Sequence, residues 1–202
     1  MPVLRSSPPS PFGRKVKIAA AELGLSGEIE IRLADTTDPE DSLRHENPLG
    51  KIPTLILEDG TVLFDSRVIL EWLDWKAGGG VILPTDPGPR FAALRLQALA
   101  DGLADAALLI VYESRARTET ERSLSWLAHQ QGKIDRTLAA LDAEPPTIDA
   151  PLTVGTIALA CALGYLDLRH GGRWRESHPR LVAWLDGFAA RVPAFEKTRF
   201  VP

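Results

Sequence analysis

Three serine residues precede the first amphipathic stretch of the chain, and the last of them stands where it can do chemistry. Ser10 lies directly before Pro11, where a helix is expected to begin. Serine followed by proline is typical of an N-cap residue and the first residue of a helix. A hydroxyl can accept one hydrogen bond with its oxygen and donate another with its hydrogen. Ser10 can therefore cap the helix, activate a substrate, or do both.

A second group of candidate residues lies between positions 51 and 66. Ser66 follows Asp65 and is expected to be the N-cap of a helix over residues 66–77. The free N–H groups at such a helix N-terminus can bind a carboxylate. Lys51 offers a point charge for an anion, and Pro53 opens a predicted strand. The alternative is a mere capping pair at 65–66 and a solvated lysine in a loop.

The cysteine and charge content argues against several classes of protein. Cys161 is the single cysteine, so an internal disulfide and a cysteine-based metal site are both excluded, and we expect no metal. Residues 1–80 carry 9 Lys or Arg against 13 Asp or Glu, and residues 81–202 carry 14 of each. Neither half is basic, which argues against nucleic acid or an anionic membrane as partner.

The ends and the apolar runs of the chain suggest its location. The first residues, MPVLRSS, lack the apolar core of a signal peptide. No run of 18 apolar residues occurs, so we expect no membrane-spanning helix. We expect a reducing, cytoplasmic setting, in which Cys161, within an apolar helix, acts as a small hydrophobic residue.

The first 77 residues read as a mixture of strands and helices. Residues 1–5 predict a strand, residues 11–23 an amphipathic helix, and the alternating pattern EIEIRL a second strand. Asp59-Gly60 between two apolar runs predicts a hairpin, and the 66–77 helix follows it. The order β-α-β, then β-β-α, predicts a mixed sheet with helices packed on it.

The remainder of the chain predicts an all-helical unit. Four glycines and three prolines within residues 77–89 mark a linker. Beyond it no strand pattern occurs, and the periodicity predicts the helices 89–117, 119–142, 153–169 and 179–191. We therefore expect an α/β domain over 1–77, a linker over 78–88 and an all-α domain over 89–202.

This organisation resembles the cytosolic glutathione transferases. The segment NPLGKIPTL resembles that family's loop before its third strand, and DS at 65–66 resembles its acidic-Ser pair before the third helix. The segment SPFG at 10–13 stands where thioredoxin-like proteins have Cys-x-x-Cys. The resemblance covers nearly the whole chain. It implies a thioredoxin-like N-terminal domain, an all-helical C-terminal bundle, and glutathione as co-substrate.

The resemblance gives Ser10 a catalytic role. In relatives that use serine, the hydroxyl stabilises the deprotonated sulfur of glutathione, which then attacks an electrophile. Lowering a thiol pKa from about 8.5 by about two units requires roughly 2.7 kcal/mol. A hydrogen bond to a charged group supplies roughly 1.5–3 kcal/mol, and a helix N-terminus roughly 0.3–1 kcal/mol more. Ser7, which also precedes a proline, is the alternative to Ser10.

The resemblance also implies the residues that hold the tripeptide. The Ile52-Pro53 bond is expected to be cis, so that the preceding backbone can pair with the cysteinyl part of glutathione. Ser66 would meet the γ-glutamyl carboxylate, Asp65 the amine, and Lys51 the glycyl carboxylate.

The electrophile is expected to bind between the two domains. The candidates are the loop before the first helix, the start of that helix, and the first helical hairpin, which contribute Pro9, Phe12, Tyr112 and Arg115. Asp101 and Asp105 are expected to be solvated on a helix surface. The resemblance further implies a two-fold homodimer with each site near the interface.

Two other functions remain open at this point. The first is glutathione-dependent isomerisation or dehalogenation in the same fold. The second is a non-enzymatic glutathione-binding or interaction protein, because several relatives keep the fold and lose activity.

Overall fold

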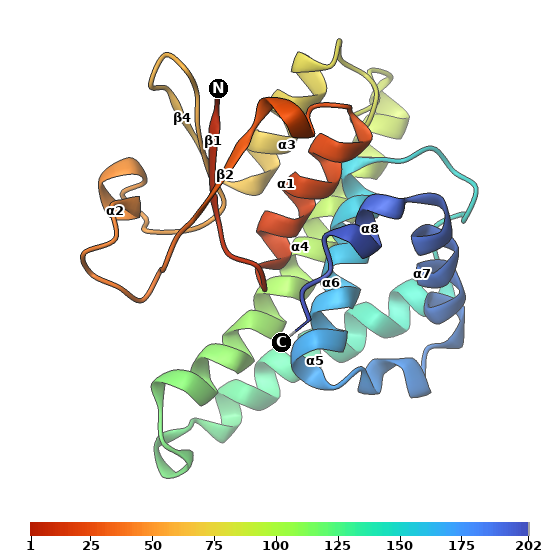
Figure 1. Ribbon diagram of the computed structural model, residues 1–202. Helices are drawn as coiled ribbons and strands as arrows, with labels where there is room; N and C mark the ends of the chain where they lie inside the picture. The colour runs from red at the N-terminus through yellow and green to blue at the C-terminus, as the bar shows by residue number, and fades with distance from the viewer. Residues whose placement is uncertain (202) are drawn as a thin grey trace.

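The computed structural model describes residues 1–201, which form a sheet-containing half followed by a helical half (Figure 1). The strands are β1 (Val3–Ser6), β2 (Glu30–Leu33), β3 (Thr54–Ile56) and β4 (Val62–Leu63). Their order in the sheet is β2-β1-β3-β4, with β1 parallel to β2 and antiparallel to β3. The predicted mixed sheet is confirmed, and its topology is that of a thioredoxin-like domain.

Two long helices cover one side of this sheet and place its inner face in the core. The helices of this half are α1 (Pro11–Glu22), α2 (Leu43–Glu46) and α3 (Ser66–Lys76). Figure 1 shows α1 and α3 on the side that faces the helical half, with α2 on the other side. Leu4 of β1 pairs with Leu55 of β3, and both side chains are at most 1% exposed. Because burying these apolar side chains is favourable, α1 packs on the face of the sheet from which they project.

The helical half is built around one helix that is buried along most of its length. The helices of this half are α4 (Pro87–Ala116), α5 (Leu124–Ala143), α6 (Val154–His170), α7 (Pro179–Arg191) and α8 (Pro193–Lys197). Helix α6 packs on α4, α7 and α1, so it joins the two halves. A helix that is apolar on all sides is expected in the core, and the segment 154–163 is buried throughout.

The linker is held by a buried carboxylate at the end of α3. Asp74 is 4% exposed and accepts hydrogen bonds from the backbone N–H groups of four successive linker residues, 80–83. Ile82 in turn accepts from the backbone N–H of Val154, at the start of α6. These bonds connect the end of the first half to the central helix of the second.

Several predicted boundaries are wrong, each for a local reason. Helix α5 begins at Leu124 rather than 119, because Ser123 caps it and residues 119–121 form a separate 3₁₀ turn. Helix α3 is capped by Asp65, whose carboxylate accepts from the Arg67 N–H at 2.9 Å, so the predicted N-cap role of Ser66 is wrong. Helix α8, which is only five residues long, was not predicted.

No helix within residues 1–201 combines the length and the apolar character that crossing a membrane requires.

Candidate functional site

Ser10 caps α1 and keeps its hydroxyl hydrogen available. Its Oγ accepts a hydrogen bond from the Gly13 N–H at 3.1 Å, and its carbonyl accepts from the Arg14 N–H at 3.0 Å. The side chain is half-buried and lines a cavity. Because the capping bond uses the oxygen as acceptor, the O–H can still donate into that cavity. The predicted capping role is confirmed, and the geometry allows a second role.

The other two serines of the first loop lie differently. Ser6 ends β1, is 1% exposed, and its Oγ makes no hydrogen bond with the described residues. A Cβ added to Gly13 would lie 2.1 Å from that Oγ, so Ser6 occupies the space that a side chain at position 13 would need. Ser7 is half-buried and does not line the cavity that Ser10 reaches. Which serine meets a substrate stays a prediction, and geometry favours Ser10.

The loop before β3 is held by a buried amide. The Asn47 side chain donates to the Lys51 carbonyl at 3.1 Å and to Thr54 Oγ1 at 3.0 Å. The predicted cis bond between Ile52 and Pro53 is confirmed. Lys51 is exposed, Ile52 is half-buried and Pro53 is buried. Asn47 therefore fixes the loop that presents the first three predicted glutathione-binding residues.

Ser66 lies in a buried network of charges that joins α1, α3 and α4. Lys15 is 1% exposed, and its Nζ donates to Asp101 Oδ1 at 2.6 Å and to Ser66 Oγ at 3.1 Å. Asp101 Oδ2 also accepts from Arg67 Nε at 2.8 Å. Asp101 is 2% exposed, so the expected solvation of its side chain is wrong. The carboxylate is buried because two cations from the other half neutralise it.

Further charges gather at the exposed edge of this network. Partial desolvation, followed by the nearby Asp101 carboxylate, raises the pKa of Asp105, while Arg67 and Lys51 act in the opposite direction. Asp65, which is exposed, also contributes to raising the Asp105 pKa. The structure thus brings Lys51, Asp65 and Ser66 toward the same region between the sheet-containing half and α4.

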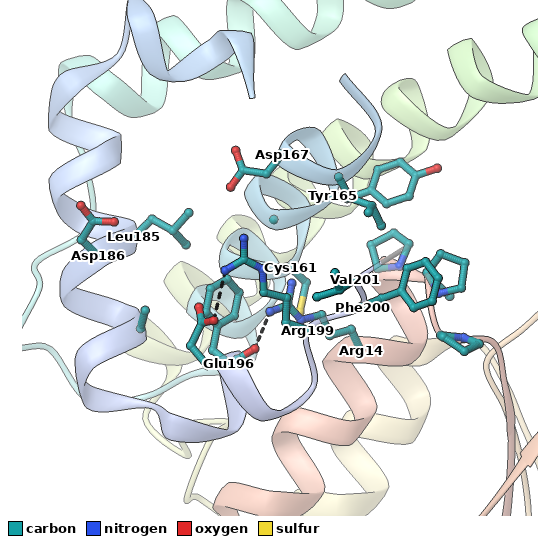
Figure 2. A pocket seen from close by; sticks show the side chains of 18 of the residues that line it. Arg14, Cys161, Tyr165, Asp167, Leu185, Asp186, Glu196, Arg199, Phe200 and Val201 are labelled. Carbon is teal, nitrogen blue, oxygen red and sulfur yellow. Dashed lines mark hydrogen bonds and ion pairs between the residues drawn. The ribbon is translucent and has the colours of Figure 1, made fainter. Parts of the chain in front are cut away.

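A cavity of about 400 Å³ opens beside Ser10, between the start of α1 and the helices α6, α7 and α8 (Figure 2). The charged residues of its lining are Arg14, Asp167, Arg175, Asp186, Glu196 and Arg199. This volume lies within the range of small-molecule sites.

Burial strongly raises the pKa values of two neutral side chains in the lining of the cavity. Burial raises the pKa of the Cys161 thiol to about 11, although Arg14 and Lys15 oppose this shift. Burial also raises the pKa of Tyr165 to about 12, against the positive charges of Arg169 and Arg115. Cys161 is therefore a protonated, buried thiol, in agreement with the structural role predicted for it.

The predicted electrophile-binding residues separate into two groups. Pro9 lines the cavity, whereas Phe12, Tyr112 and Arg115 do not. Phe12 is half-buried, its ring centroid lying 5.8 Å from Lys15 Nζ, and Tyr112 is 44% exposed on α4. A role for these three residues stays a prediction.

The sequence reasoning missed Arg14, Lys15 and Arg67. Lys15 lies four residues before Ala19, and Arg14 four residues before Ile18, so both fall on the apolar side of α1. A cation in such a position needs a buried partner or ligand, and this was the available signal. Among residues 1–201, no three His, Cys, Asp or Glu side chains lie close enough together to hold a metal ion.

The fold and the loop with its cis proline define a thioredoxin-like domain joined to a helical bundle. Two family models match the chain: the glutathione S-transferase N-terminal domain over residues 9–75 and the C-terminal domain over 125–187. The protein belongs to the glutathione S-transferase family.

Particular relatives resemble the chain over nearly its whole length. It is 36% identical to the uncharacterized GST-like protein YibF of Escherichia coli K12, over 90% of this chain and 91% of YibF. A glutathione transferase family member from Pseudomonas fluorescens Pf-5, crystallised with bound glutathione, superposes with a TM-score of 0.93 at 39% identity and covers both chains completely. A second Pf-5 structure, with bound S-(propanoic acid)-glutathione, gives a TM-score of 0.88 at 39% identity over 98% of this chain and 99% of that one.

Proposed function

We propose that this protein binds glutathione and transfers its thiolate sulfur to a small electrophile, and that Ser10 stabilises the thiolate. The observation that carries the proposal is the Ser10 hydroxyl, which accepts from the Gly13 N–H at 3.1 Å and retains its own hydrogen beside the cavity. That hydrogen can donate to a sulfur anion placed at the N-terminus of α1. Hydrogen bond and helix dipole act in the same direction on the thiol pKa.

The remaining glutathione contacts follow from the loop before β3 and the start of α3. We assign the backbone of Ile52, before the cis Pro53, to the cysteinyl part of the tripeptide. Ser66 receives a hydrogen bond from Lys15, so its hydroxyl hydrogen stays available for the γ-glutamyl carboxylate. Asp65 takes the amine, and Lys51 takes the glycyl carboxylate.

The proposed reaction needs no redox step. The thiolate sulfur attacks an electrophilic carbon, a C–S bond forms, and the bond to a leaving group such as chloride breaks, with the electron pair departing on that group. For addition to a conjugated double bond, the carbon skeleton instead takes up the proton released by the thiol. The conjugate bound to the Pf-5 relative carries a propanoic acid group on the glutathione sulfur, and this supports a thioether as product here.

The substitution Ser10→Ala tests the assignment. We expect kcat with a chloronitrobenzene to fall about 10- to 100-fold, because a hydrogen bond to a charged group is lost. Glutathione affinity measured at about pH 6, where the bound thiol is mostly protonated, should change less than about threefold, since the hydroxyl acts on the sulfur anion alone. The thiol pKa in the complex, measured from the ultraviolet absorbance of the thiolate, should rise by about one to two units.

Ser7→Ala is the matched control and should leave all three quantities unchanged. An unchanged thiol pKa in the Ser10→Ala complex would remove Ser10 from the mechanism. Glutathione binding without turnover of any chloronitrobenzene, haloalkane or maleyl compound would favour the non-enzymatic alternative. A homodimer and a cytoplasmic location stay predictions of the family.

A further inference from the structure

Arg14 is a buried cation that no carboxylate neutralises within the described part of the chain. Its side chain is 8% exposed and lines the cavity beside Ser10. Nε donates to Thr198 Oγ1 at 3.3 Å and Nη2 donates to the Phe195 carbonyl, both neutral acceptors. Its Cζ lies over the Phe195 ring, 4.0 Å from the centroid, so the other partner of the charge is a neutral aromatic ring. Nη1 makes no hydrogen bond with residues 1–201 and lies against Gly164, where an added Cβ would be 2.6 Å away. Figure 2 shows the side chain reaching into the cavity beside Cys161.

The other charged groups of the cavity are already paired. Asp167 accepts from Arg175 Nη2 at 2.7 Å and from Trp174 Nε1 at 2.8 Å. Asp186 is 70% exposed and lies 3.9 Å from the same arginine. The exposed Glu196 pairs with Arg199 at 3.3 Å. Asp167 and Asp186 therefore share Arg175, and Glu196 pairs with Arg199. Within residues 1–201, Arg14 is the arginine of this lining that forms no ion pair.

Burying a guanidinium without an ionic partner is energetically costly unless a ligand supplies the negative charge. Burial is the largest influence on the Arg14 pKa and lowers it, while the more distant Glu196 and Asp167 carboxylates act in the opposite direction. Arginine is the side chain best suited to carboxylates, because its planar group offers N–H donors in a fixed geometry. A carboxylate at Nη1 would gain a charge-assisted hydrogen bond in a largely desolvated place.

Arg14 lies one helical turn after Ser10, the N-cap of α1, and both line the cavity. We propose that Arg14 binds a carboxylate carried by the electrophile, so that the enzyme selects small anionic electrophiles. This inference rests on the proposed transferase function, since it places the electrophilic carbon near Ser10 and the carboxylate near Arg14. In the reaction of a chloronitrobenzoate, the C–S bond forms, the C–Cl bond breaks and chloride leaves, while the carboxylate stays unchanged on Arg14.

The first experiment measures binding to the unmodified protein and needs no turnover. Isothermal titration compares S-carboxyethylglutathione with S-carbamoylethylglutathione, which differ in one carboxylate against one amide. We expect the acid to bind about 10- to 100-fold more tightly than the amide. Equal affinities would overturn the proposal, whatever the outcome of the Ser10 experiment. Conversely, a preference for the acid without any catalysis would leave Arg14 as an anion site and remove only the transferase function.

Two substitutions then assign the preference to Arg14. Arg14→Gln retains a donor for the Phe195 carbonyl and removes the charge, so it should abolish the preference for the acid. Arg14→Lys retains the charge and should keep most of it, which also covers the case in which the glutamine variant does not fold. Glutathione affinity serves as the control for folding and should stay within about twofold, because glutathione itself is not assigned to Arg14.

Arg199→Gln is the matched control at the cavity mouth, where the side chain is exposed and already paired with Glu196. We expect it to change the preference less than about threefold, as exposed pairs contribute little. A loss of preference in this variant, with none in Arg14→Gln, would overturn the proposal. A second result would also overturn the proposal: Arg14→Gln lowers the affinity for glutathione but leaves the ratio of the acid and amide affinities unchanged. Arg14 would then bind the tripeptide itself.

Kinetics give a second, independent readout. A chloronitrobenzoate and the corresponding chloronitrobenzamide, with the same ring positions, are both assayed in the unmodified protein and in Arg14→Gln. We expect the variant to raise KM for the acid about 10-fold or more, with kcat little changed and the amide unaffected. Equal losses for both compounds would mean a general disturbance of the site and would contradict a carboxylate at Arg14.

Discussion

Two adjacent residues of α1 show two ways to bury a cation. Lys15, 1% exposed, donates to Asp101 at 2.6 Å and to Ser66 at 3.1 Å. Arg14, 8% exposed, donates to Thr198 and to a backbone carbonyl and meets no carboxylate among residues 1–201. Successive positions of a helix point about 100° apart, so one cation enters the joint between the two halves and the other enters the cavity.

The difference separates structure from function on the same helix. A buried ion that is fully paired contributes to holding elements together, and removing one partner exposes the cost of the other. A buried ion paired only with neutral acceptors retains capacity for a ligand. Cys161 lies near both cations, which each lower its pKa, yet burial dominates and keeps the thiol protonated. Desolvation therefore controls this region more than the charges do.

The largest expected effect comes from breaking the pair at Lys15. Asp101→Leu removes the carboxylate, leaves the buried ammonium with the Ser66 hydroxyl alone, and should lower the free energy of unfolding by about 3–5 kcal/mol. Urea unfolding followed by circular dichroism measures this. The double variant Lys15→Met with Asp101→Leu should recover most of the loss, because two apolar side chains then meet. A loss below about 1 kcal/mol in the single variant would mean that the pair is not buried as described.

The next effect tests whether the joint between β1 and α1 is as close as the structure has it. Gly13→Ala would place a Cβ 2.1 Å from Ser6 Oγ, so we expect a loss of about 1–3 kcal/mol in the free energy of unfolding. Ser6→Ala combined with Gly13→Ala should restore stability, since the next nearest atom, Ser6 Cβ, would lie 3.4 Å away. An equal loss in the single and double variants would place the strain elsewhere.

Local patterns in the sequence were sufficient for most of the fold. The Ser10-Pro11 pair predicted the start of α1, and Asp59-Gly60 predicted the β3–β4 turn, because the signal and the structure lie within a few residues. Asp65 and Ser66 are both good capping residues, and neighbouring alternatives of this kind cannot be separated by type alone. The short helix α8 has too few residues to show a period.

Contacts between distant segments could not be predicted from the pattern. Lys15 and Asp101 are 86 positions apart, and although Lys15 falls on the apolar side of α1, nothing in the sequence indicates Asp101 as its partner. Only the packing of α1 against the helical half brings the two charges together. The same holds for Arg14, whose neighbours in the cavity come from α6 and from the segment around α8. Thus the serine at the site could be predicted from the sequence, whereas the partners and surroundings of the two cations could not.

A smaller effect concerns the thiol between the two cations. Burial raises the Cys161 pKa from 9.0 to about 11, so at rising pH the unfolded chain loses this proton before the folded chain does. Stability is therefore full below about pH 8 and should fall by about 1.3 kcal/mol by about pH 10. Cys161→Ala should lack this component of the pH dependence. The comparison stops at about pH 10, because Tyr165, with a pKa of about 12, affects the stability mainly at higher pH. Identical pH dependence in both proteins would show that the thiol is not desolvated.

The smallest expected effect is that of Ser6→Ala, which is compared with the same substitution at a second buried serine, Ser66. Ser6 and Ser66 are 1% and 2% exposed. Within residues 1–201, Ser66 Oγ receives a hydrogen bond from Lys15 at 3.1 Å, whereas Ser6 Oγ makes none. Ser6→Ala removes a hydroxyl that is already desolvated and unpaired, so the free energy of unfolding should change by less than about 0.5 kcal/mol or rise slightly.

Ser66→Ala is the matched substitution and should cost about 1–3 kcal/mol, because a charged donor loses one of its two acceptors. Urea unfolding of both variants under the same conditions gives the comparison directly. If Ser6→Ala costs as much as Ser66→Ala, then Ser6 must hold a partner such as an ordered water, and the hydroxyl behind Gly13 would be part of the polar network around α1. If both substitutions cost little, then Asp101 alone stabilises the Lys15 ammonium. The difference between Lys15 and Arg14 would then be that Lys15 has a carboxylate partner and Arg14 has none among residues 1–201.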